Sequence, residues 1–246
     1  MYHFFVSPEQ IGEHEIRIEG GDVNHIRNVL RMQPGEQITV SSGADGREYR
    51  CEISAVGADC VTAQIMWAEE TGAELSSRIC LFQGLPKGDK MELIIQKAVE
   101  LGVSEIVPMA TRRAVVKLDR KKEEAKCKRW NAISESAAKQ AKRLVIPEVK
   151  HVMSFPEAVQ YASSFDRKMI PYELAKGMDE TRSFLASVHP GDSVAVFIGP
   201  EGGFDPAEIE LAQSSGLQPV TLGRRILRTE TAGMTVLSVL MVQLER

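Results

Sequence analysis

Two glycine-bearing segments in the second half of the chain have residue types and spacing that could build a ligand site. Residues 197–204 read FIGPEGGF and lie between an apolar run and a helical pattern. Residues 222–232 read LGRRILRTETA and follow the same order of strand, glycine loop and helix. Glycine lets the backbone approach a ligand and expose its amides, and open α/β sheets bind ligands at the carboxyl ends of their strands. The two loops therefore predict one shared pocket.

The charged side chains of these loops indicate which ligands the pocket could take. The first loop lacks the Lys-Ser/Thr pair of a phosphate-binding loop, and its Glu201 would repel a phosphate, so a neutral or cationic ligand fits better. The second loop carries Arg224, Arg225 and Arg228. Two alternatives stay open: the first loop is only a tight strand-to-helix turn, or the three arginines only pair with surface carboxylates.

Three other segments carry cationic side chains. Lys87, in the turn after an expected strand, either reaches an anionic substrate or is a solvated turn lysine. Residues 112–143 hold twelve Lys and Arg against four Asp and Glu, a net charge of +8 that indicates either a phosphate-binding surface or a salt-bridged helix face. Residues 1–72 hold five against twelve, yet Arg27 and Arg31 lie one turn apart on an expected helix.

Composition excludes several classes of protein. The chain has 246 residues, of which 43% are hydrophobic and 26% charged, the balance of a globular protein rather than a disordered one. The four cysteines form no CxxC pair, and the five histidines are scattered, so zinc and hydrolytic chemistry are not expected. No apolar run approaches the roughly 20 residues of a membrane span, and no signal peptide is visible. We expect a cytoplasmic protein with reduced thiols.

Hydrophobic periodicity predicts the elements that must position these groups. Residues 1–72 alternate as short strands with one helix at 22–32, which indicates a small barrel or curled sheet. From residue 78 onward strands alternate with helices, as in an α/β domain with a mostly parallel sheet. The expected strands are 79–83, 104–109, 168–172, 193–198 and 218–222, and the expected helices are 90–101, 121–143, 155–163, 206–215 and 229–244.

Taken together, these motifs resemble the SPOUT-class RNA methyltransferases. Within that class the chain is similar to the RsmE family, which methylates N3 of a uridine in 16S ribosomal RNA. The run IGPEGGF together with LGRRILRTETA is the specific part of the resemblance. Thr111-Arg112-Arg113 departs from the Glu-Arg-Ser-like run expected there. The matching stretches are His25–Arg31, Gly84–Gly102, Arg129–Pro147, Ile198–Phe204 and Leu222–Ala232.

The resemblance implies a fold, a cofactor and partners. It implies a PUA-like β-barrel that binds RNA over residues 1–72, and over residues 73–246 a SPOUT domain with a deep trefoil knot. It also implies S-adenosylmethionine as methyl donor, no metal, a homodimer, and 16S ribosomal RNA or the small ribosomal subunit as substrate. The cofactor contacts that it implies are Glu173, Leu174, Ile198, Gly199, Gly203, Leu222, Gly223, Ile226, Leu227 and Arg228.

The reaction itself implies further roles. Uridine N3 must lose its proton before it attacks, so a base or a cation that stabilises the anion is required. Two readings stay open beside this one: a non-catalytic RNA-binding or ribosome-assembly protein, and a SPOUT enzyme with another RNA target such as a ribose 2′-hydroxyl. The candidate catalytic residues are Arg228, Glu201, Glu230, Arg112 and Lys87, and the candidate RNA-binding residues are Arg27, Arg31, Arg112, Arg129 and Arg143.

Overall fold

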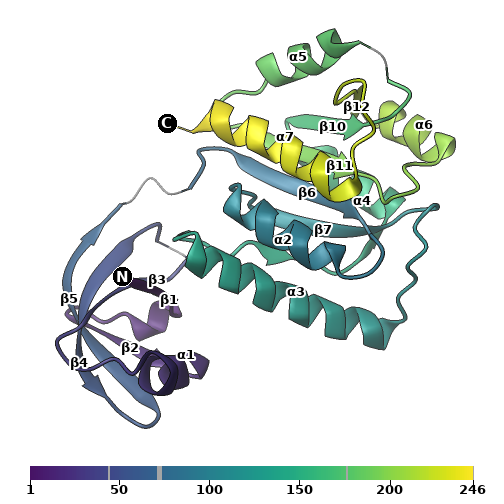
Figure 1. The fold of residues 1–246 in the computed structure, drawn as a ribbon. Helices are drawn as coiled ribbons and strands as arrows, with labels where there is room; N and C mark the ends of the chain where they lie inside the picture. Colours follow the sequence, from purple (N-terminus) through teal and green to yellow (C-terminus); the bar gives the residue numbers. More distant parts are fainter. Residues whose placement is uncertain (44, 71–73, 176, 246) are drawn as a thin grey trace. The chain divides into compact units, whose positions relative to one another are not determined.

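In a computed structural model the chain forms two compact units, and the structure describes residues 1–43, 45–70, 74–175 and 177–245 (Figure 1). The first unit comprises Met1–Glu74 and Ala138–Ile146, and the second comprises Leu75–Ala137 and Pro147–Arg246. The boundary expected between residues 72 and 73 lies outside the described residues. The second segment of the first unit has no counterpart in the sequence analysis.

The first unit is built on one curled sheet, as expected, and its strand order is β1-β3-β4-β5-β2. β1 runs parallel to β3 and the other pairings are antiparallel. Ile16 and Ile18 are buried between exposed charged neighbours, which is the alternation of a strand with one face on a core. The strands are β1 (Tyr2–Phe5), β2 (Glu15–Glu19), β3 (Gln37–Ser41), β4 (Glu48–Val56) and β5 (Cys60–Glu69).

The expected helix at residues 22–32 is shorter and less regular than the sequence predicts. A single turn, α1 (Gly21–Asn24), continues as a wider π-type helix over His25–Leu30. It ends at Arg31, whose φ of 55° is in the left-handed region. Stretches of π-helix are rare and are often found at functional sites, and periodicity alone does not distinguish them from an α-helix.

The second unit holds a parallel sheet with the strand order β12-β10-β11-β6-β7-β8, and β9 pairs with β7. This confirms the expected α/β class. The strands are β6 (Arg78–Gly84), β7 (Glu105–Ala110), β8 (Glu148–Val149), β9 (Met153–Ser154), β10 (Arg167–Pro171), β11 (Ser193–Ile198) and β12 (Gln218–Val220). The helices are α2 (Lys90–Glu100), α3 (Arg120–Gln140), α4 (Phe155–Tyr161), α5 (Met178–Ala186), α6 (Pro206–Ser214) and α7 (Thr229–Leu244).

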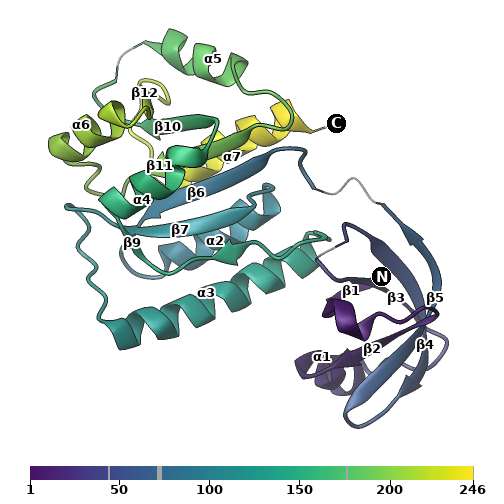
Figure 2. The ribbon, with the colours of Figure 1, turned by 180° about the vertical axis from the view of Figure 1, so that it is seen from behind.

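Helices cover both faces of this sheet, with α2 and α7 on one side and α4 on the other (Figures 1 and 2). The central strand β11 is apolar along most of its length because both of its faces are buried. Phe197 of β11 stacks on Phe82 of β6 with ring centroids 4.2 Å apart. Within the described residues, no helix combines the length and the apolarity that crossing a membrane requires.

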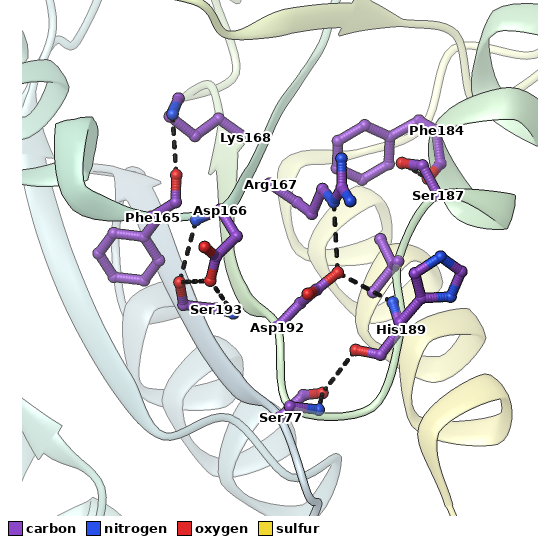
Figure 3. A network of polar contacts seen from close by, with 12 residues as sticks. Ser77, Phe165, Asp166, Arg167, Lys168, Phe184, Ser187, His189, Asp192 and Ser193 are labelled. Atoms are coloured by element: carbon purple, nitrogen blue, oxygen red, sulfur yellow. Dashed lines mark hydrogen bonds and ion pairs between the residues drawn. The ribbon is translucent and has the colours of Figure 1, made fainter.

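A network of polar contacts fixes the amino-terminal ends of three strands (Figure 3). The Asp166 carboxylate accepts a hydrogen bond from the Ser193 backbone N–H at 2.9 Å, and the Ser193 hydroxyl accepts one from the Asp166 N–H at 3.0 Å. The Asp192 carboxylate accepts from Arg167 Nε at 3.2 Å, and Ser77 Oγ donates to the His189 carbonyl at 3.3 Å. These contacts join the starts of β6, β10 and β11, and the irregular loops lie at the opposite ends of the strands.

Candidate ligand-binding site

A cavity of about 420 Å³ lies in the second unit where β10, β11 and β12 end. The segments that follow these three strands supply most of its wall, and the first turn of α7 completes it. Leu174 is outside the lining set. Every other predicted cofactor contact lines this cavity: Glu173, Ile198, Gly199, Gly203, Leu222, Gly223, Ile226, Leu227 and Arg228.

Two glycines allow the loops to pack closely around the cavity. Gly203 has a φ of +66°, and a Cβ there would lie 3.2 Å from a carboxylate oxygen of Glu173. A Cβ on Gly84, at the end of β6, would lie 2.6 Å from the Pro200 ring. A Cβ at Gly84 would force Pro200 in the cavity wall to move, whereas one at Gly203 would be strained by the positive φ and would shift the Glu173 carboxylate by a few tenths of an ångström.

Thr229 holds the start of α7 against the loop that follows β11. Its hydroxyl donates to the carbonyl oxygen of Gly199 at 2.6 Å and accepts from Gln83 Nε2 at 2.9 Å. Both Thr229 and Gln83 are buried. Because the partners of Thr229 are distant in the sequence, local pattern could not reveal them.

Lys90, on the first turn of α2, joins two carboxylates from different loops. Its ammonium lies 3.0 Å from Glu201 Oε1 and 3.4 Å from Glu230 Oε2, and it lines the cavity. The hydrogen bond that the Lys90 ammonium donates to Glu201 raises the pKa of Lys90, so the ammonium stays charged. Lys87 is the lysine predicted for the site from this segment, whereas the lysine that lines the cavity is Lys90.

The environment of Glu201 keeps its carboxylate ionised. Burial alone would raise the pKa of Glu201, but its own backbone N–H and the Lys90 ammonium outweigh burial and lower the pKa. The Lys87 backbone N–H adds a hydrogen bond at 3.2 Å. A carboxylate with a lowered pKa is a weak proton acceptor.

Three predicted catalytic residues lie outside the set that lines the cavity: Glu230, whose carboxylate reaches the Lys90 ammonium, Lys87 and Arg112. The Lys87 side chain is exposed, and the residue contributes its backbone N–H to Glu201. Arg112 donates its backbone N–H to Glu208 at 2.8 Å, and its guanidinium lies 3.3 Å from Asp205. These contacts hold the segment after β7 to the start of α6.

The predicted RNA-binding arginines differ in their availability. Arg27 and Arg31 are exposed, and the described residues offer neither side chain an ion pair. Arg129 is also exposed, and its Nε lies 2.7 Å from a Glu92 carboxylate oxygen. A second nitrogen of its guanidinium donates to the other Glu92 oxygen at 2.8 Å, so Arg129 would have to release this bidentate partner to bind a phosphate.

Arg143 is placed differently from the prediction. Its side chain is 5% exposed, and its Nε lies 3.0 Å from both carboxylate oxygens of Glu74. Glu74 also accepts the Leu144 backbone N–H at 2.8 Å. The assignment of Arg143 to RNA binding is therefore corrected, because a buried and paired guanidinium is not available to a phosphate.

Arg224, Arg225 and Arg228 form the basic side of the cavity. All three are exposed, and within the part of the chain that the structure describes none has an ion pair. The alternative in which they pair with surface carboxylates is therefore not what the structure shows. Ile226, between them, is 91% exposed. The residues that line the cavity also include Glu173 and Glu201.

The described residues contain no group of three or more His, Cys, Asp or Glu side chains placed to hold a metal ion. The arrangement is instead a mixed cavity of backbone groups, apolar side chains and charges of both signs. Such a site can bind a cationic organic ligand on its carboxylate side while an anion contacts its guanidinium side.

Comparisons with known proteins agree on one family. Residues 73–241 match the RNA methyltransferase domain, and residues 18–66 match the RNA methyltransferase PUA domain. The chain is 40% identical over 250 residues to ribosomal RNA small subunit methyltransferase E of Bacillus subtilis (strain 168), which covers 99% of this chain and 96% of that protein.

Two solved structures share the fold over nearly the whole chain. Ribosomal RNA small subunit methyltransferase E from Neisseria gonorrhoeae, bound to S-adenosyl methionine, has a TM-score of 0.86 at 31% identity and covers 98% of this chain and 97% of that one. A structure from Legionella pneumophila with the bound cofactor SAM has a TM-score of 0.86 at 34% identity, with the same coverage of 98% and 97%.

Proposed function

This chain belongs to the ribosomal RNA small subunit methyltransferase E family, and on that premise we propose that it transfers a methyl group from S-adenosylmethionine to N3 of a uridine in 16S ribosomal RNA. The observation that carries the proposal is the cavity at the carboxyl ends of β10, β11 and β12, which combines carboxylates with unpaired guanidiniums. The choice of uridine N3 rests on the family resemblance of the sequence.

The residues of the cavity fit S-adenosylmethionine. Its sulfonium and ammonium groups are cationic and suit the Glu173 carboxylate, while Ile198, Leu222 and Leu227 offer apolar surface to an adenine ring. The close approach allowed at Gly203 leaves backbone groups available to the ligand. When bound, the cofactor supplies an electrophilic methyl group, and that chemistry is its own.

The protein contributes orientation and charge. Arg228 lines the cavity with a guanidinium that has no ion pair in the described residues, so it can stabilise the negative charge that develops on a uracil oxygen as N3 loses its proton. Glu201 is ionised and paired, so its role is to hold Lys90 and the loop after β11 in place. Glu230 holds the same ammonium from the start of α7.

We propose that the chain between β11 and α7 forms the trefoil knot that the resemblance implies. β12 lies at the edge of the sheet, yet α7 packs on β11 and α2 near its middle (Figure 1). The chain must therefore return past the loop after β11, where the Thr229 hydroxyl binds the Gly199 carbonyl. Knots are rare in proteins, and these close contacts support one here.

We also propose that the protein is a homodimer. α7 is apolar around much of its circumference, and Val239 and Val242 stay exposed on it. Exposed aliphatic side chains on an apolar helix suit burial against a second copy.

Within the first unit, Arg27 and Arg31 are the cations that we assign to RNA binding.

An assay of methyl transfer tests the proposed function. The protein is incubated with radiolabelled S-adenosylmethionine and with small ribosomal subunits or 16S ribosomal RNA from a strain that lacks the modification, and the modified nucleoside is identified by mass spectrometry. We expect N3-methyluridine at a single position. A 2′-O-methyl nucleoside would assign another target, and absence of transfer together with RNA binding would favour the non-catalytic alternative.

A further inference from the structure

We propose that Arg224 and Arg225 form a binding site for the RNA phosphates next to the target nucleotide, with Ile226 in contact with an unstacked base or ribose. The inference rests on the proposed function and assigns the RNA-facing side of the same cavity. It places RNA recognition on the loop between β12 and α7, where the sequence analysis considered the arginines but left their role open.

Arg224 and Arg225 have no carboxylate partner among the described residues, unlike the arginines of this unit that were first predicted to bind RNA. The Arg112 guanidinium faces Asp205, and that of Arg129 lies against Glu92. Arg224 and Arg225 are exposed at the cavity without an ion pair among the described residues. A free guanidinium presents five N–H donors in a planar fork that matches a phosphate. Arg224 and Arg225 can therefore bind phosphate without first releasing a carboxylate.

The cavity is lined by charges of both signs, and these come from different segments of the chain. The carboxylates of Glu173 and Glu201 come from the segments after β10 and β11, and the guanidiniums come from the segment after β12. A cationic methyl donor and a polyanionic RNA would each meet the opposite charge. Because carboxylates and guanidiniums line the same cavity of about 420 Å³, the RNA would be held next to the methyl donor.

Ile226 adds an observation that does not depend on charge. Its side chain is 91% exposed although it lies in the wall of the cavity. Enzymes that modify a base take it out of the stack and pack it against aromatic or apolar side chains. An exposed aliphatic side chain flanked by arginines provides both the apolar contact and the phosphate contacts for such a nucleotide.

The test compares two double variants of the full-length protein with the same loss of charge. Arg224→Gln/Arg225→Gln removes the proposed contacts, and Arg17→Gln/Arg182→Gln removes two exposed arginines that form short-range pairs on β2 and α5. The probe is a fluorescein-labelled 12-nucleotide oligouridylate, and its Kd is measured by anisotropy between 50 and 200 mM KCl. Cofactor affinity and oligomeric mass are measured on each preparation.

The expected result is specific to the first variant. Loss of two phosphate contacts on single-stranded RNA should reduce the slope of log K against log salt by about 1.4, and affinity at low salt by about tenfold. The control variant should keep the slope of the unmodified protein, and both should keep the cofactor affinity to within about threefold. Ile226→Ser should weaken oligouridylate binding at every salt concentration without changing the slope.

Three results would overturn the inference. Equal slopes for the two double variants would show that Arg224 and Arg225 touch no phosphate. A change in oligomeric mass would assign the loop to a contact between copies, and a loss of cofactor affinity that matches the loss for RNA would assign it to the cofactor. Failure of the unmodified protein to bind cofactor would instead refute the proposed function, and the comparison of slopes would still report on the arginines.

Discussion

Replacing Arg143 by methionine should weaken the first unit by about 2 kcal/mol and leave RNA binding nearly unchanged. Removing one partner of a buried ion pair costs roughly 3–5 kcal/mol. The Glu74 side chain is 26% exposed and keeps the Leu144 N–H at 2.8 Å, so the remaining carboxylate is partly compensated and the cost falls below that range. Glu74→Gln should cost more, about 3–4 kcal/mol, because the Arg143 side chain is only 5% exposed and loses its counter-charge.

Hydrogen–deuterium exchange of the peptides from β3 to β5 measures this cost within the first unit. A loss of about 2 kcal/mol corresponds to exchange about 30-fold faster for amides that open with the whole unit. The double variant Glu74→Gln/Arg143→Met should lose less than the sum of the single variants. The reasoning is refuted if Arg143→Met exchanges like the unmodified protein while its affinity for RNA falls.

Three further predictions concern the sheet of the first unit and the cavity. Burial lowers the pKa of His3, although Glu48 partly opposes this shift. The unfolded state therefore binds more protons than the folded state below about pH 6.5, and the free energy of unfolding should fall as the pH drops through that range. Urea titrations at pH 7.5 and 5.5 should show a smaller loss of stability between the two pH values for His3→Gln than for the unmodified protein. Thr229→Val removes the hydrogen bond to the Gly199 carbonyl and should weaken cofactor binding about tenfold by calorimetry, while Thr229→Ser retains it. Arg228→Gln should lower kcat about 10²–10³-fold because negative charge on the uracil is no longer stabilised. Glu201→Gln should lower kcat about tenfold without unfolding the protein. Full activity of Arg228→Gln would show that Arg228 takes no part in the reaction.

The elements of the second unit were largely predictable because apolar strands alternate with glycine turns and capped helices. The bounds 193–198 and 229–244 match β11 and α7. α5 (Met178–Ala186) was missed because its nine residues contain few apolar side chains, too few for a clear helical stripe. The π-type turn at His25–Leu30 has the same apolar spacing as a short α-helix.

Pairing between distant residues explains what the sequence did not predict at the site. The basic pattern of residues 112–143 is real, yet Arg129 meets Glu92 and Arg143 meets Glu74, partners that local periodicity does not reveal. Lys90 was missed for the same reason, since its carboxylates lie on two later loops. The glycine loops were found because backbone approach to a ligand leaves a local signature.

Calorimetric titration of the full chain with S-adenosylmethionine, with the mass of the same preparation measured by ultracentrifugation, tests the central claim most directly. We expect one binding site per chain in a dimer, and weaker binding in Gly203→Ala, where a Cβ would lie 3.2 Å from the Glu173 carboxylate. A folded protein, shown free of carried-over cofactor, that does not bind S-adenosylmethionine would contradict the methyltransferase account. A monomer that binds it would contradict only the proposed dimer.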